Sequence, residues 1–369
     1  MSTFITRFDT SGPGVRLAVK DLIDMDGVPT TAGCRAVAHE AVAAIRDAAC
    51  LHGARLAGAR IVGRTNLHEL ALGVTGVNPW YGTPVNPLDS RLVPGGSSSG
   101  SAVAVATHEA DVAYGSDTGG SVRIPAACCG TAGLKTTWGR VSLVGVWPLS
   151  PSFDTVGPMA RDVAGLVLGM ELLEPGFTVS ERGPLRVGRL RVDADPVIDA
   201  AIDAALAASE WEVNDIELPR WHEATASGGL LLVAEAWETD RELVARRPGE
   251  IGADVVGRLK LGGSLDAKGL ASARLVQQEW SAVLDEMFRR VDVIATPTLT
   301  VFPPGLDGGE ELLMARCTLP VNLAGVPALA IPVPTSGALP GSLQLIGPHR
   351  SEEMLLAAGL VLESAISTL

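Results

Sequence analysis

The chain has 369 residues, of which 47% are hydrophobic and 19% are charged, and its formal net charge is −13. The apolar content is enough for a large core, which excludes a disordered or fibrous chain, and the negative charge opposes binding to nucleic acid or to an anionic membrane. Five cysteines without framework spacing, and a start without a basic and apolar leader, favour neither a disulfide scaffold nor secretion. We therefore predict a cytoplasmic protein.

The first part of the chain alternates predicted strands and helices. Residues 15–22 are apolar apart from Arg16, Lys20 and Asp21, and they predict a buried strand that contains Lys20. Residues 42–59 are rich in alanine at helical spacing and predict a helix, and residues 60–63 predict a short strand. Turn-forming residues dominate from 78 to 100, which indicates a long irregular loop.

The same alternation continues to the end of the chain. Small residues at 101–107 predict a buried helix, and residues 111–115 predict a strand that leads into a second glycine-rich loop. The later predictions are a helix opened by Asp195 and Pro196, a helix over about 270–290, a strand over 291–296, and a final helix capped by Ser351.

The order of these elements predicts the fold class. Residues 317–348 carry no Asp, Glu, Lys or Arg, but their six prolines exclude a membrane-spanning helix. No linker or internal repeat divides the chain, so we expect one domain over residues 1–369. Alternating strands and helices predict an α/β/α sandwich around a mixed, mostly parallel central sheet.

The sequence lacks the motifs of several kinds of catalytic and binding site. The histidines show no metal-binding spacing, and the adjacent Cys128 and Cys129 are poorly placed to chelate one zinc ion. No phosphate-binding glycine loop is present in a P-loop or dinucleotide-binding pattern. Asp117 opens an Asp-Thr-Gly tripeptide, but an aspartic protease needs a second copy. We therefore expect no metal and no cofactor.

Lys20 is an unusual residue for an apolar strand. An ammonium group in such a place must find an anion or lose its proton, because its desolvation costs several kcal/mol. A salt bridge with Asp21 or Asp24 is the structural alternative. A buried lysine with a lowered pKa, in contrast, serves as a general base at neutral pH.

Ser98 offers a different nucleophile. Residues 96–100 fit the pattern Gly-x-Ser-x-Gly of the α/β-hydrolase nucleophile elbow, with His222 or His349 as a possible base. An elbow requires a strand directly before it, whereas residues 89–94 have the composition of a loop. The motif is therefore weak support for an esterase.

Two longer segments resemble the amidase signature of the amidase-signature hydrolases. Residues 94–101 read PGGSSSGS and residues 115–126 read GSDTGGSVRIPA. The likeness continues through stretches at 133–136, 139–142 and 152–161, and it includes AVKD at 18–21 and the segments 320–332 and 339–348. The signature core spans about 90–161, and the likeness is thin only over about 172–270, a region that is variable in the family and shapes the substrate site.

The resemblance implies a catalytic triad of Lys20, Ser97 and Ser121. Ser121 would be the nucleophile, and Ser97 would carry its proton to a neutral Lys20. Gly96 would precede Ser97 through a cis peptide bond. The backbone amides of Thr118, Gly119, Gly120 and Ser121 would form the oxyanion hole.

Neighbouring residues receive structural interpretations. Asp117 and Arg123 are expected to form an ion pair that supports the nucleophile loop rather than to contact substrate. Asp154 is expected to brace a turn, and Cys128 and Cys129 to lie in the core. Lys20 occurs early for this family, and the middle region is short, so the substrate is the least defined part of the prediction.

The resemblance predicts an amidase that hydrolyses the C–N bond of a small-molecule carboxamide through an acyl-Ser121 intermediate. The alternatives are a glutaminase-type subunit of a tRNA-dependent amidotransferase and an esterase that uses Ser98. We expect a small-molecule amide as the partner, with no nucleic acid and no membrane, and leave a homodimer open.

Overall fold

The computed structural model describes residues 3–180, 183–308 and 311–367. Within these residues, eleven strands form one sheet in the order β1-β3-β2-β4-β6-β5-β10-β11-β9-β7-β8. The strands are β1 (Phe4–Arg7), β2 (Arg16–Lys20), β3 (Arg60–Thr65), β4 (Val112–Ser116), β5 (Ala132–Lys135), β6 (Val156–Ala160), β7 (Arg186–Leu190), β8 (Glu212–Ile216), β9 (Val293–Pro297), β10 (Ala328–Val333) and β11 (Gly341–Ile346). The mixed α/β class is therefore confirmed.

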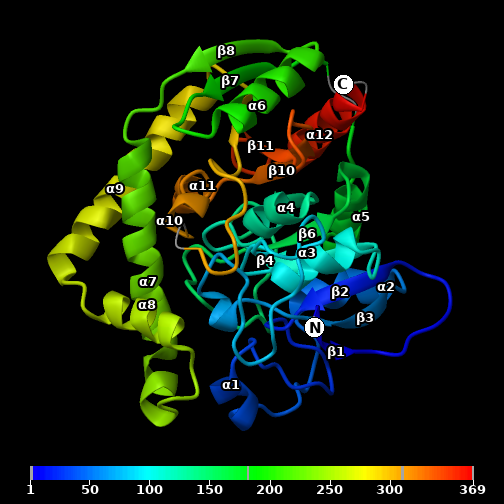
Figure 1. Ribbon diagram of the computed structural model, residues 1–369, viewed down its shortest axis with the longest axis vertical. Coiled ribbons are helices and arrows are strands. Elements are labelled where there is room, and N and C mark those ends of the chain that lie inside the picture. The colour runs from blue at the N-terminus through cyan, green and yellow to red at the C-terminus, as the bar shows by residue number, and fades with distance from the viewer. Residues whose placement is uncertain (1–2, 181–182, 309–310, 368–369) are drawn as a thin grey trace.

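Helices cover both faces of this sheet (Figure 1). They are α1 (Arg35–Glu40), α2 (His52–Leu56), α3 (Ser99–Ala106), α4 (Arg123–Cys129), α5 (Val163–Leu173), α6 (Pro196–Ala208), α7 (Trp221–Arg246), α8 (Ala253–Gly263), α9 (Ala267–Phe288), α10 (Glu311–Met314), α11 (Leu319–Ala324) and α12 (Glu352–Ile366), with 3₁₀ turns η1 (Ala49–Leu51) and η2 (Glu69–Ala71). Helices α5, α6 and α12 share one apolar core with the sheet. Helices α3 and α4 lie against the other face, where α7, α9 and α11 share a further core.

The sheet differs from the prediction in strand direction. Of the ten neighbouring pairs formed by described residues, four are parallel and six are antiparallel. The parallel pairs lie toward the two ends of the sheet, where helices connect the strands. In the centre, β10 returns directly as β11 through residues 334–340, and a short connection of this kind produces an antiparallel pair. The expected majority of parallel pairs is therefore wrong.

The predicted helix over residues 42–59 is also wrong in its first half. Regular α-helix covers only His52–Leu56, after one 3₁₀ turn. The backbone before it bonds to the segment that follows β2: the N–H of Ala44 donates to Val28 O at 3.1 Å, and that of Ala48 donates to Asp24 O at 2.8 Å. These tertiary hydrogen bonds outweigh the helical propensity of the alanines. Val42 and Ile45 consequently remain 82% and 92% exposed.

The other predicted elements agree closely with the structure. The helix predicted after Asp195 is α6, and the Asp195 side chain accepts a hydrogen bond from the N–H of Val197. The final helix begins after Ser351, although the Ser351 hydroxyl donates to Pro348 O instead of capping the helix. In the described residues no helix is long and apolar enough to cross a membrane.

Candidate active site

Lys20 lies at the end of β2, fully buried, and contacts three serine hydroxyls. Its Nζ is 2.6 Å from Ser97 Oγ, 2.9 Å from Ser98 Oγ and 2.9 Å from Ser116 Oγ. Asp21, the expected salt-bridge partner, instead pairs with Arg64 at 2.6 Å. The structural alternative for Lys20 is therefore wrong, because its polar partners in the described chain are hydroxyl groups.

Burial determines the protonation of Lys20. The removal of the amine from water lowers its pKa to about 7, and the more distant charges of Asp117 and Asp154 limit the decrease. At neutral pH a substantial fraction of the amine is uncharged. A neutral amine has a lone pair, so Lys20 has the electronic requirement for a general base.

Ser97, the shortest contact of Lys20, has a backbone that is anchored by hydrogen bonds. The Gly96–Ser97 peptide bond is cis, as the resemblance implies. The backbone around it is anchored, because the N–H of Gly96 donates to Val74 O at 2.6 Å and the N–H of His68 donates to Ser97 O at 3.0 Å. The Ser97 side chain is completely buried.

Ser121 lies in the loop that follows β4, directly before α4. The N–H of Ser98 donates to Ser121 O at 3.2 Å, so the two glycine-rich loops are in contact. Ser121 keeps 6% of its surface exposed, whereas Lys20 and Ser97 keep none. The preceding Gly120 has φ +127°, and a Cβ there would lie 2.3 Å from Thr318 Oγ1, so this position requires glycine. The loop presents Ser121 as the accessible hydroxyl of the predicted triad.

The predicted oxyanion hole needs one correction. The N–H of Gly120 donates to the Asp117 carboxylate at 2.9 Å, so this amide already has an acceptor. No hydrogen-bond acceptor within the described chain occupies the amides of Thr118, Gly119 and Ser121. These three amides are the donors that remain for a substrate carbonyl oxygen.

Asp117 and Arg123 form the expected ion pair under the nucleophile loop. Arg123 Nε donates to Asp117 Oδ2 at 3.0 Å and its Nη2 donates to Oδ1 at 2.8 Å, with both side chains fully buried. Burial alone would raise the pKa of Asp117, but the Arg123 guanidinium holds it well below its usual range. Asn322 and Gln344 complete the polar shell of this pair. The pair therefore has the bracing role that the sequence predicted.

The remaining structural interpretations also agree with the structure. Asp154 accepts hydrogen bonds from the backbone N–H groups of Leu149 and Ser150 at 2.9 and 3.2 Å, and therefore braces a turn. Cys128 and Cys129 are buried and unbridged, and burial raises the pKa of both thiols.

The family of this chain follows from comparison with known proteins. The Amidase family model matches residues 13–356. The chain belongs to the amidase family. This amidase is 34% identical over 398 residues to a glutamyl-tRNA(Gln) amidotransferase subunit of Chloroflexus aggregans, covering 94% of the chain and 81% of the relative. The corresponding protein of Halobacterium salinarum is 32% identical over 422 residues, covering 98% and 99%. A crystal structure of an amidase superposes with a TM-score of 0.88 and 32% identity, covering 95% and 84%.

Family membership makes this protein a C–N hydrolase. Ser98 does not have the geometry of an esterase nucleophile, since it is fully buried and its hydroxyl donates to Ser116 O at 3.3 Å. In the described residues no three His, Cys, Asp or Glu side chains lie close enough to share a metal ion. A reaction without metal or cofactor stays a prediction.

Sequence reasoning about this amidase missed Ser116. Its hydroxyl is a third partner of Lys20, and it lies at the end of β4, which pairs with β2 in parallel. The ends of parallel neighbours meet at one edge of a sheet, so a polar residue closing the neighbouring strand was the available signal. The sequence pattern alone places Ser116 only within the glycine-rich motif.

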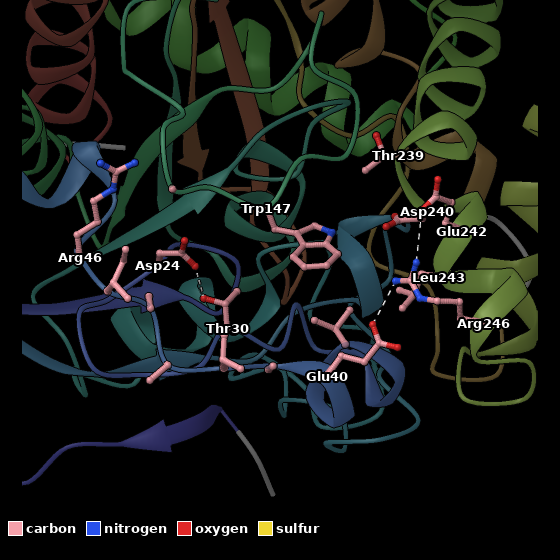
Figure 2. Close-up of a pocket in the computed structure, with 17 residues that line it drawn as sticks. Asp24, Thr30, Glu40, Arg46, Trp147, Thr239, Asp240, Glu242, Leu243 and Arg246 are labelled. Carbon is pink, nitrogen blue, oxygen red and sulfur yellow. Dashed lines mark hydrogen bonds and ion pairs between the residues drawn. The ribbon is translucent and has the colours of Figure 1, made fainter.

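A cavity of about 770 Å³ lies between the segment after β2, the loop around Trp147, and α7 (Figure 2). Lys20, Ser97 and Ser121 do not line it. The Trp147 indole nitrogen faces Asp240, yet neither group forms a hydrogen bond with suitable geometry within the described chain. Burial raises the pKa of Asp240 to about 7, and the nearby indole N–H limits this increase. The cavity is therefore distinct from the predicted triad.

Proposed function

We propose that this amidase hydrolyses the C–N bond of a small-molecule carboxamide through an acyl-Ser121 intermediate. The observation that carries the proposal is Lys20, which is buried among three serine hydroxyls, with Ser97 Oγ 2.6 Å from its Nζ, and whose pKa is lowered to about 7. No carboxylate of the described chain pairs with the amine, so it is available to accept a proton. We also infer a cytoplasmic location, which is supported by five free cysteines.

We infer the direction of proton transfer from the donors and acceptors around Lys20. A neutral amine has two N–H donors and one lone pair. Ser98 donates its own proton to Ser116 O and can therefore accept an N–H from Lys20. The shortest contact, from Lys20 to Ser97 at 2.6 Å, is the one assigned to the lone pair. Ser97 would then donate to Lys20 and accept the proton of Ser121.

The proposed reaction has two stages. In the first, the Ser121 oxygen attacks the amide carbon while its proton passes through Ser97 to Lys20. The amides of Thr118, Gly119 and Ser121 stabilise the charged oxygen, and the proton returns through Ser97 to the departing nitrogen. In the second stage, a water molecule loses a proton along the same path and attacks the acyl carbon. The bond from Ser121 Oγ to the acyl carbon then breaks, and the proton returns through Ser97 to this oxygen, which leaves the carboxylic acid product, ionised at neutral pH, and free Ser121.

Covalent labelling tests the nucleophile directly. Wild-type protein treated with a fluorophosphonate should carry the adduct on Ser121, as shown by peptide mass spectrometry. Ser121→Ala should lose both the adduct and the release of ammonia from a panel of small primary amides, while Ser98→Ala should still be labelled. An adduct on Ser98 would overturn the proposal.

A glutaminase subunit of an amidotransferase is the second candidate, because curated relatives of this chain have the name of such a subunit. This candidate predicts slow hydrolysis of glutamine by the isolated chain, faster hydrolysis with partner subunits, and transfer of ammonia to glutamyl-tRNA. The net charge of −13 opposes direct contact with tRNA, so partner subunits would have to bind it. Rapid hydrolysis of simple amides by the isolated chain, without a preference for glutamine, would favour the first candidate.

A further inference from the structure

Glu235, on helix α7, reaches the turn that supports the nucleophile loop. Its Oε2 accepts a hydrogen bond from Ser150 Oγ at 2.8 Å and from the Ser152 N–H at 3.0 Å, and its Oε1 accepts one from Ser152 Oγ at 2.5 Å. Arg274, on α9, also donates to Oε1. Glu235 lies within residues 172–270, where the likeness to the family is thin. It thus connects helices α7 and α9 to the signature core.

The other side of the same turn contacts the predicted oxyanion hole. Asp154 accepts the N–H groups of Leu149 and Ser150, and its Oδ1 accepts the Thr118 hydroxyl at 2.6 Å. The backbone of the nucleophile loop is paired with the turn as well, since Asp117 N–H donates to Thr155 O at 2.8 Å. The turn is therefore held between Glu235 and Thr118.

The charge of Glu235 suits this role. Burial alone would raise its pKa, but hydrogen bonds from Ser152, Ser150 and Arg274 hold it below the usual range. The carboxylate is therefore ionised at neutral pH and accepts several hydrogen bonds at once, which are stronger than those between neutral groups. Glu238, on the same helix, does not reach this turn in the same way. Its side chain is 62% exposed and pairs with Arg241 of the helix.

We propose that Glu235 is a positioning residue that fixes the backbone amide of Thr118 through Ser150, Ser152 and Asp154. Glu235 touches no reacting atom. Its effect is on the placement of an oxyanion-hole donor, and misplacement of such a group by about 1 Å lowers a rate by as much as about 100-fold. The inference rests on the proposed function, because it requires Ser121 to be the nucleophile and Thr118 to face the substrate oxygen.

The test compares Glu235→Gln with the matched control Glu238→Gln, three residues further along the same helix. The readouts are the rate of Ser121 phosphonylation by a fluorophosphonate and, with an amide substrate, kcat and KM. Glu235→Gln should reduce the phosphonylation rate and kcat about tenfold, with KM changed less than about twofold, because an interaction made in the transition state is weakened. Glu238→Gln should match wild type.

A double mutant separates positioning from general stability. Thr118→Val removes the hydroxyl that Asp154 binds but keeps the backbone amide. If Glu235 acts through this connection, Glu235→Gln combined with Thr118→Val should be no slower than the slower single variant. The inference would be overturned if the rate losses of the two single variants multiplied in the double mutant. A wild-type rate in Glu235→Gln, or a change in its KM alone, would also overturn it.

Folding and the underlying function are controlled separately. Circular dichroism and Tm should show folded variants. If Glu235→Gln does not fold, Ser152→Ala replaces it, since this change removes one hydroxyl from the same bridge and should slow phosphonylation in the same direction. Absence of the Ser121 adduct in wild type would refute the proposed function, whereas an adduct formed equally fast in Glu235→Gln or its replacement would refute only the role of Glu235.

Discussion

Replacement of Lys20 by arginine tests whether the buried amine works as a neutral base. The pKa of Lys20 is about 7. One pH unit below this value, about one-tenth of the Lys20 amine is uncharged, and one unit above it the uncharged fraction is about nine-tenths. The kcat/KM of wild type should therefore rise about tenfold between about pH 6 and pH 8. Arginine keeps its proton across this range, so Lys20→Arg should lose activity by at least about 10³-fold, as much as Lys20→Ala.

The stability of the protein gives an independent check on the same pKa. Burial lowers the pKa of Lys20 from 10.5 to about 7, so the unfolded chain binds the extra proton between these values. The free energy of unfolding contributed by this residue should accordingly rise with pH across that window, by about 4–5 kcal/mol in total. Urea titrations of wild type and Lys20→Met at several pH values would measure it. A folded Lys20→Arg variant that kept most of the activity, with a flat pH profile in wild type, would refute the base assignment.

Four further outcomes are expected. Ser97→Ala should lower kcat by a factor on the order of 10² with a smaller change in KM, and an unchanged kcat would show that Lys20 reaches Ser121 without a relay. Asp117→Asn should destabilise the protein by about 3–5 kcal/mol in urea denaturation, because it leaves the Arg123 guanidinium buried without its counter-charge. The matched control is Asp47→Asn, which breaks a more exposed ion pair and should cost much less. Asp240→Asn should raise the free energy of unfolding by about 2–4 kcal/mol near pH 8 and by little near pH 4. The reason is that folding raises the pKa of Asp240 to about 7, so its ionised form opposes folding only at the higher pH. Equal effects at both pH values would contradict this. Exhaustive chelation should leave turnover unchanged, and activity lost and then restored by zinc would refute the metal-free reaction.

The elements around the candidate site could be predicted because their signals are local. Lys20 ends β2 directly after the apolar residues of that strand, and the glycine-rich loop before Ser121 follows the predicted strand β4. The spacing of residues along each segment contains this information. The cis bond before Ser97 came from the family resemblance, since nothing in the local composition requires it.

The remaining features depend on contacts between distant segments. Residues 42–48 did not form the predicted helix, because their backbone bonds to the strand-like segment after β2. The amide of Gly120 is occupied by Asp117, and only the folded loop shows this. Ser116 and Glu235 were missed for the same reason: their partners lie 96 residues and 83–85 residues away in sequence. For Glu235, neither the propensity of the residue nor the pattern around it specifies such a partner. For Ser116, its position at the end of a strand becomes a signal only once β2 and β4 are known to pair.

The long-range origin of the Lys20 environment has a consequence for newly made chains. Its hydroxyl partners Ser97 and Ser116 are 77 and 96 residues away, so the low-dielectric environment does not exist until β2 and β4 have paired. Before that point the amine is hydrated and fully protonated near neutral pH, and Ser121 has no base to activate it. In the proposed mechanism, folding is therefore the step that supplies Ser121 with its base, and an unfolded chain lacks an activated nucleophile.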